Sequence, residues 1–311
     1  MDASPPFPLA GETAALVSSV LWAGAGIVFR RLRGRVPPMA VNLGKNGVAA
    51  TLLGLTILAF PALGGVGAIS GASLVLLAVS GLLGLTICDS FLLRAMMEIG
   101  PRRATLLGIL APCLVFVGAL LPPFSQLDRV ADVRPWAGFL LALAGVVLAA
   151  TGALPVASAP LDPEAERRGV RDALLAAVFQ ASGFLLARRA FELGAPPIPG
   201  AFVRLVVGTV GLVVVGGVTG RLSAWRTALL VRGVPVTLFV TAFFGTFLGI
   251  GLNQTAIAWA RSTGVAAVLN SLAPVWLIPL SAIFLGEKIT LRGVVATVLA
   301  LGGVALLSAG R

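Results

Sequence analysis

Charged residues inside apolar stretches are the first candidates for chemistry in this sequence. Four of them stand out: Lys45, Asp89, Arg94 and Arg204. A charge in hydrocarbon is costly and usually faces a partner or an aqueous cavity, so these residues mark candidate sites for an ion or a solute. Glu98 follows Arg94 by one helical turn, and this spacing favours a local ion pair between the two.

Lys45 and Asp89 are expected to lie at a similar depth. If helices span 38–60 and 73–97, Lys45 lies about 10 Å from the start of the first and Asp89 about 12 Å from the end of the second, at about 1.5 Å per residue. These two helix ends share one side of the membrane. We therefore predict that the two charges pair or share one cavity. The alternative is a buried ion pair that only fixes packing.

Arg204 has no acid at the matching place in the helix predicted over 233–260. The nearest polar side chains there are Asn253 and Gln254, which cannot neutralise a guanidinium. A guanidinium can bind a carboxylate or a phosphate through two parallel hydrogen bonds. Arg204 is therefore a candidate ligand for an anionic group of a solute, and hydrogen bonding to backbone carbonyls is the structural alternative.

Other polar, aromatic and proline residues complete the predicted site. Pro112 and Pro274 each remove a helical N–H, which leaves the carbonyls of Gly108 and Asn270 without their usual donors. Such breaks are tolerated where a cavity or another group satisfies the backbone. The predicted substrate-binding residues are Lys45, Asp89, Arg204, Asn253, Asn270, Ser271, Trp22, Gln180 and Trp276.

The composition requires a membrane to solvate most of these elements. Hydrophobic residues make up 58% of the chain and charged residues 11%, whereas a soluble domain carries roughly a quarter charged residues. The net charge of +11 comes from arginines in short clusters between apolar runs. This placement suits membrane topology better than nucleic-acid binding.

The residue types also restrict the chemistry. The sequence contains no histidine, and its two cysteines, Cys88 and Cys113, lie inside apolar segments. We therefore expect no metal, no disulfide and no enzymatic activity. The sequence lacks a phosphate-binding loop of the Gly-x-x-x-x-Gly-Lys-Ser/Thr type, so we expect no nucleotide or other cofactor.

Ten apolar stretches are long enough to predict transmembrane helices, which indicates an all-α membrane protein. The first stretch lacks a basic leader and is expected to stay as a helix. The predicted helices cover 12–30, 38–60, 73–97, 102–122, 135–154, 170–191, 197–219, 233–260, 264–285 and 290–309.

Four features recur in the same order at nearly constant offsets of 158 to 162 residues. They are Arg30-Arg31 with Arg188-Arg189, Pro37-Pro38 with Pro196-Pro197, Lys45 with Arg204, and Ala111-Pro112 with Ala273-Pro274. We therefore predict two five-helix repeats, 12–154 and 170–309, joined by a polar linker over 155–169. Five helices per repeat give the second copy the opposite orientation, an arrangement that places a solute site at the midplane.

Lysine and arginine counts indicate how the chain is oriented. Fourteen of these residues lie in the connections on the linker side, and six lie on the other side. The positive-inside rule then favours both termini outside the cytoplasm.

Several motifs resemble those of EamA-type transporters of the drug/metabolite transporter superfamily. The run from Leu269 to Thr290 has a central Pro274-Val275 and ends in Leu-Gly-Glu-Lys-Ile-Thr, as in that family's ninth helix. Ser19-Val-Leu-Trp-Ala-Gly24, Arg204 and the stretch from Asp89 to Gly100 are similar to its first, second and third helical patterns. Lys45 stands where the family usually has arginine, and Leu121-Pro-Pro-Phe124 replaces the Leu-Gly-Glu motif after the fourth helix.

The resemblance implies a ten-helix carrier with cytoplasmic termini, which conflicts with the charge count. It favours a secondary transporter, an exporter or exchanger of a small polar metabolite such as an amino acid, in a bacterial inner membrane. Asp89 is the one acid well inside a predicted helix and thus the candidate proton carrier. A lipid-phosphate flippase and a passive channel are the alternatives. We expect membrane lipid and a small solute as the partners, no nucleic acid, and a monomer.

Overall fold

The computed structural model describes residues 9–118, 121, 133–151, 162–259, 269 and 271–309, and every regular element within them is helical. The first half contains α1 (Ala10–Arg31), α2 (Pro38–Ala59), α3 (Gly71–Gly81), the π-helix η3 (Leu82–Cys88), α4 (Asp89–Ile99), α5 (Pro101–Leu107), α6 (Leu110–Gly118) and α7 (Val133–Thr151). The second contains α8 (Pro163–Glu192), α9 (Pro197–Val218), α10 (Leu222–Leu229), α11 (Val234–Thr241), the π-helix η5 (Ala242–Leu248), α12 (Gly249–Trp259), α14 (Ala273–Leu285) and α15 (Leu291–Ala309). Two short 3₁₀ turns, Pro61–Leu63 and Val66–Ala68, connect α2 to α3.

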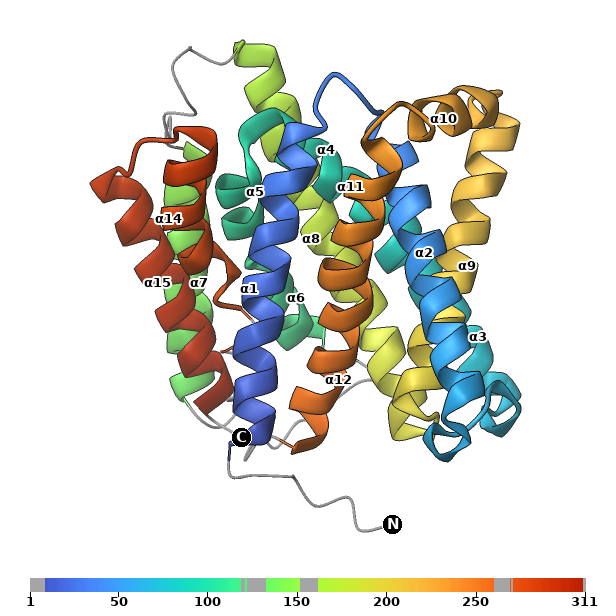
Figure 1. Cartoon of the computed structure of the whole chain (residues 1–311). Helices are drawn as coiled ribbons and strands as arrows, with labels where there is room; N and C mark the ends of the chain where they lie inside the picture. Colours follow the sequence, from blue (N-terminus) through green and yellow to red (C-terminus); the bar gives the residue numbers. More distant parts are fainter. Residues whose placement is uncertain are drawn as a thin grey trace.

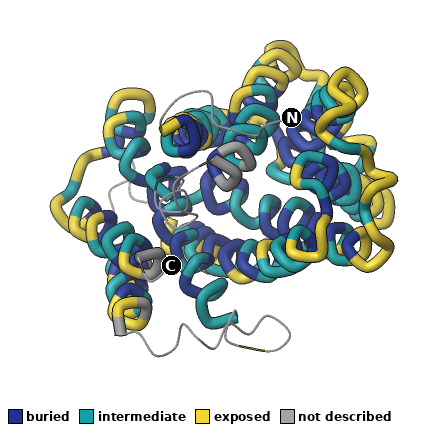
Figure 2. The backbone as a smooth tube through the Cα atoms, turned by 90° about the horizontal axis from the view of Figure 1, so that it is seen from below, coloured by how far each residue is buried: buried dark blue, intermediate teal, exposed yellow. Residues whose placement is uncertain are grey.

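The described helices have the length and surface of membrane-spanning segments. Seven continuous helical stretches are long and apolar enough to cross a bilayer, and three shorter apolar helices accompany them. Large apolar side chains lie on the outside: Leu58 is 79% exposed, Val218 85% and Ile283 73%. Figure 2 shows exposed residues mainly around the rim of the bundle and buried ones toward its centre. Lipid is the solvent that accepts such a surface, so the chain is an integral, multi-pass membrane protein.

The two halves run in opposite directions. In Figure 1, α1 begins at the lower end of the molecule, whereas α8 begins at the upper end. The first helix of each half packs on equivalent helices of the other half. α1 packs on η5, α12 and α14, and α8 packs on η3, α4 and α6. The equivalent pairs α2 with α9 and α7 with α15 pack on each other. This pairing is that expected of two repeats related by a two-fold axis in the membrane plane.

The α7–α15 contact depends on two glycines at equivalent positions. A Cβ on Gly145 would lie 2.5 Å from Ala300 N and 2.7 Å from Ala296 O, and a Cβ on Gly303 would lie 2.6 Å from Ala142 Cα. Backbone atoms cannot move aside as a flexible side chain can, so both positions need glycine for the two helices to approach this closely.

Gly303→Val should therefore destabilise the protein and separate α15 from α7. We expect a loss of about 1–3 kcal/mol or more, the usual cost of overpacking. Thermal unfolding of the purified protein would measure it. Gly302→Val is the matched control, because a Cβ on Gly302 meets only the end of the Leu141 side chain at 3.6 Å. Equal Tm values for the two variants would contradict this assignment.

Each half contains a π-helix at the same place. η3 and η5 are seven residues long, and 160 residues separate their first residues. Small residues let a neighbouring helix approach each π-helix closely. A Cβ on Gly183 of α8 would lie 3.2 Å from the Cα of Gly84 in η3, and a Cβ on Gly245 of η5 would lie 2.7 Å from the Cβ of Ala25 in α1. Segments of π-helix are rare and frequently occur at functional sites. The predictions from sequence did not include them.

Candidate functional site

Lys45 and Asp89 form the ion pair that their predicted depths suggested. Lys45 Nζ lies 2.5 Å from Asp89 Oδ2, and the side chains are only 8% and 17% exposed. Asp89 is the first residue of α4, directly after η3, and Lys45 comes from α2. Because two desolvated charges need further hydrogen bonds to be tolerated, the groups around the pair decide its stability.

One asparagine on α2 bonds to the pair, and a second asparagine on the same helix supports the first. Lys45 Nζ donates to Asn46 Oδ1 at 2.9 Å. Asn42 Nδ2 donates to Leu85 O at 2.8 Å and to Ser90 Oγ at 3.1 Å, and Asn46 Nδ2 donates to Leu85 O at 3.3 Å. Asn42, Lys45 and Asn46 are spaced to share one helix face, and this spacing is the signal in the sequence that indicates the network. The network fixes α2 to η3 and α4.

Arg204 lies near this pair, on α9 of the other half. No described residue makes an ion pair or hydrogen bond with its guanidinium, and its Nε is buried without a partner. Asp89 is the acid whose charge acts on Arg204, without a direct ion pair between them. A buried donor without a partner is unusual in a native structure and points to a water, an ion or a ligand group.

Glycines on α3 and η3 let Arg204 approach. A Cβ on Gly81 would lie 2.5 Å from Arg204 O, and one on Gly84 would lie 3.3 Å from Arg204 Nη2. The guanidinium therefore extends along η3 toward the turn that ends at Asp89. Any larger residue at Gly81 would push α9, and Arg204 with it, away from the pair.

Gln180 of α8 reaches the same region through Cys88. Cys88 Sγ donates to Gln180 Oε1 at 3.0 Å, and Cys88 immediately precedes Asp89. The site thus draws Lys45 and Asp89 from the first half and Gln180 and Arg204 from the second. Apolar side chains of α2 and α9 close the seam beside it: Ala49, Leu53, Ala201 and Leu205.

The predicted tryptophans form a second group around α1. Trp276 Nε1 donates to Ser19 Oγ at 2.8 Å, which joins α14 to α1. Trp22 is 42% exposed and packs its ring against Gly249 of α12. Asn253 is half-buried one turn further along α12. Ser271 lies in the turn before α14, and Asn270 and the side chain of Gln254 lie outside the described residues.

Both predicted helix-breaking prolines lie in the first turn of a helical segment. The fourth span is interrupted by a turn at Gly108 and Ile109, and α6 begins two residues before Pro112. Pro274 is the second residue of α14. Pro112 has no N–H to donate to the Gly108 carbonyl, and that carbonyl accepts from Ala111 N at 2.9 Å instead.

The predicted pair of Arg94 with Glu98 was also wrong. Arg94 Nε lies 3.3 Å from Asp172 Oδ2 of α8, and Glu98 pairs with Arg33 at 3.1 Å. Asp172 is fully buried and also binds Arg171. This second acid inside a helix was missed because α8 begins at Pro163, seven residues before its predicted start.

A second buried charge cluster lies where α1, α5 and the α14–α15 connection meet. Arg102 and Glu287 are 4% and 8% exposed. Arg102 Nε and Nη2, Arg30 Nη1 and Glu287 Oε1 are all buried without a hydrogen-bond partner. Burial raises the pKa of Glu287 from its usual 4.5, and the charges of Arg102 and Arg30 oppose that rise.

Glu287 should therefore make the folded protein relatively more stable at low pH. The folded state keeps the proton of the Glu287 carboxyl over a pH range in which the unfolded state has lost it. The contribution of Glu287 to the free energy of unfolding therefore falls as pH rises from about 4.5 through the raised pKa. Glu287→Gln removes this titration. The Tm difference, variant minus wild type, should increase across this range. Glu164→Gln, at an 81% exposed side chain, is the control. Parallel Tm curves for wild type and Glu287→Gln would contradict the expectation.

Among the described residues, no three histidine, cysteine, aspartate or glutamate side chains come together as metal ligands. The site is instead an array of paired and unpaired charges with amide groups. Such an array suits reversible binding of a polar solute.

Comparison with known proteins agrees with this architecture. The sequence profile of the EamA-like transporter family matches residues 9–151 and 168–309, one match on each half. No curated protein matches the chain. A solved crystal structure shares 18% sequence identity with a TM-score of 0.61 and 95% coverage of both chains, a likeness that shows the fold alone. The family is one of transporters, so this match indicates a transport function. Because the two matches together cover most of its residues, the chain belongs to the EamA-like transporter family.

Proposed function

We propose that this chain is a secondary transporter that exports or exchanges a small polar metabolite such as an amino acid. The observation that carries the proposal is the Arg204 guanidinium, which has a buried Nε without a partner and lies beside the Lys45–Asp89 pair. A solute carboxylate would satisfy Arg204. A solute ammonium would compete with Lys45 for Asp89.

The location of these groups suits alternating access. Lys45 and Asp89 belong to one repeat and Arg204 to the other, so a solute bound to both would be held across the seam between the halves. Rocking of one half against the other would then expose the solute to each side in turn. Release of Asp89 from Lys45, by a proton or by the solute, is the proposed switch.

We further propose that all ten helical stretches cross the bacterial inner membrane. The three shorter ones, within 136–149, 273–285 and 291–306, would complete five spans in each of the repeats 12–154 and 170–309. The segment 155–169 would act as the linker. A single copy would suffice, because both repeats that line the site are in one chain.

Counterflow in proteoliposomes tests the function. Vesicles preloaded with one unlabelled amino acid would receive the same labelled amino acid outside, across a panel of amino acids and organic acids. A carrier should give saturable uptake that the internal solute accelerates. Uptake that rises linearly and ignores the internal solute would show a channel. Translocation of labelled phospholipid without solute counterflow would show a flippase.

A further inference from the structure

A groove on the linker-side end of the molecule combines basic and apolar residues. It encloses about 660 Å³ and is lined mainly by the first three turns of α8, with Arg103 of α5. Arg103 fixes its inner wall: Nη1 lies 2.6 Å from Glu166 Oε1, and Nε donates to Ala149 O of α7 at 3.1 Å. The side chains that α8 contributes to its lining include Glu166, Arg167, Arg171, Leu174 and Leu175.

Positive charge exceeds negative charge in this groove. Arg103 is neutralised by Glu166, but Arg167 is exposed and makes no ion pair with any described residue. Arg171 shares Asp172 with Arg94, so that one carboxylate faces two guanidiniums. Among the residues that line the groove, three arginines therefore face one acid, Glu166, which leaves an excess of two positive charges.

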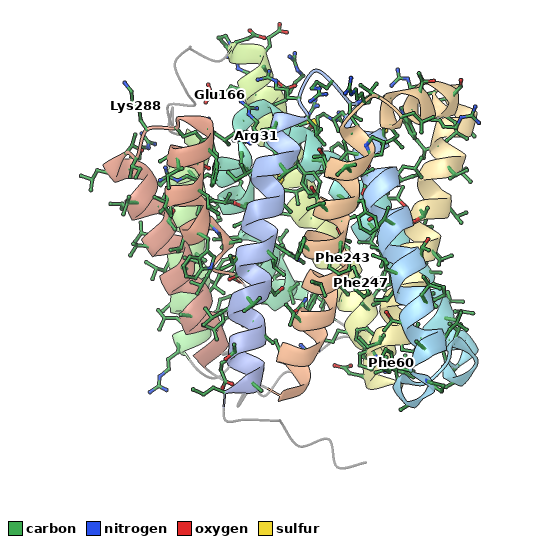
Figure 3. The ribbon with its side chains drawn as sticks, viewed as in Figure 1. Arg31, Phe60, Glu166, Phe243, Phe247 and Lys288 are labelled. Carbon is green, nitrogen blue, oxygen red and sulfur yellow. The ribbon has the colours of Figure 1, made fainter. Side chains whose placement is uncertain are left out.

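The depth of the groove matches the boundary between lipid headgroups and acyl chains. α8 has 30 residues, about 45 Å of helix, which exceeds a hydrocarbon core of roughly 30 Å. The charged residues between Glu164 and Asp172 place most of the excess length at the start of α8, so its first turns lie at the membrane interface. Figure 3 shows Glu166 near the same end as Arg31 and Lys288. One turn after Arg171, the same face of α8 becomes apolar and carries Leu174 and Leu175.

We propose that this groove binds an anionic phospholipid. The phosphate would contact Arg167 and Arg171, since guanidinium groups bind phosphate oxygens in pairs. The first part of an acyl chain would lie on Leu174 and Leu175. Basic pockets between helix ends are a recurring form of lipid recognition. The bound lipid would link α8 of the second repeat to α5 and α7 of the first, and this role is separate from the transport of the solute.

Native mass spectrometry of the purified full-length chain tests the proposal, with phosphatidylglycerol and phosphatidylcholine as the probes. The wild type should bind phosphatidylglycerol about tenfold more tightly than phosphatidylcholine, and R167Q/R171Q should lose this preference. The control is R221Q/R226Q, which neutralises two exposed arginines at the same end, away from the groove. Equal affinity for both lipids in the wild type, or equal loss in both double variants, would overturn the proposal.

A second pair of measurements separates a lipid from a free anion. Leu175→Ser should weaken phosphatidylglycerol binding severalfold while leaving binding of inorganic phosphate unchanged. If Leu175→Ser leaves lipid binding intact and inorganic phosphate displaces the lipid, the groove is an anion site and the lipid assignment is wrong. The single variant Arg167→Gln guards against misfolding, because Arg167 has no partner among the described residues, and it should lower the preference with an unchanged Tm.

Discussion

Asp89→Asn should abolish transport and lower the stability of the protein. The change leaves the Lys45 ammonium buried without a negative charge, because the new amide and Asn46 offer it only neutral acceptors. Breaking a buried ion pair by removing one partner costs about 3–5 kcal/mol, a large part of the stability of a typical protein. Counterflow in proteoliposomes and Tm in detergent would measure the two effects. A variant with wild-type counterflow would exclude the pair from the mechanism.

Two double variants separate a functional pair from a structural one. Lys45→Met with Asp89→Leu removes both charges, and such replacements of a buried pair are often neutral or stabilising. We expect its Tm to recover while transport stays absent. Recovery of transport as well would show that the pair only fixes packing. Exchanging the charges, Lys45→Asp with Asp89→Lys, should transport better than either single variant if the two groups pair directly.

Arg204→Lys should reduce transport of carboxylate-bearing solutes by about tenfold or more, because an ammonium cannot replace the two parallel hydrogen bonds of a guanidinium. Uptake of neutral solutes should change less, and the folded yield should stay near that of the wild type because Arg204 holds no described side chain. Arg221→Lys, at an exposed position outside the site, is the matched control. A drop in folded protein that accounts for the whole loss of uptake would instead assign Arg204 a structural role.

Helix positions and the central ion pair could be predicted because they depend on local pattern. The depth of Lys45 and Asp89 follows from counting residues along two apolar helices of known rise. The prediction from hydropathy alone placed the start of α8 seven residues too late, at 170 instead of Pro163. Asp162 and Pro163 mark that start by capping chemistry, since the Asp162 side chain accepts from Glu164 N and Ala165 N.

Other features depend on contacts that no local pattern indicates. Arg94 binds Asp172 of another helix instead of its sequence neighbour Glu98, because α4 packs against α8 in the folded bundle. Arg102, the first residue of a predicted helix, is buried next to Glu287 of the α14–α15 connection. The π-helices were missed because their hydrogen bonds shift by one residue without a required residue type. Gly81 and Gly84 become meaningful only once α9 is known to lie against them.

The matching positions of η3 and η5 have a consequence for the history of the chain. A π-helix fits extra residues into its turns relative to an α-helix, so a one-residue insertion in an ancestral α-helix creates one. Two independent insertions at the same place in both halves would be a coincidence. The insertion is explained most simply if it occurred in a gene for a single ancestral repeat, before that gene was duplicated and fused. The acid at Asp89 and its replacement by Gly249 would then be later divergence between two copies that began alike.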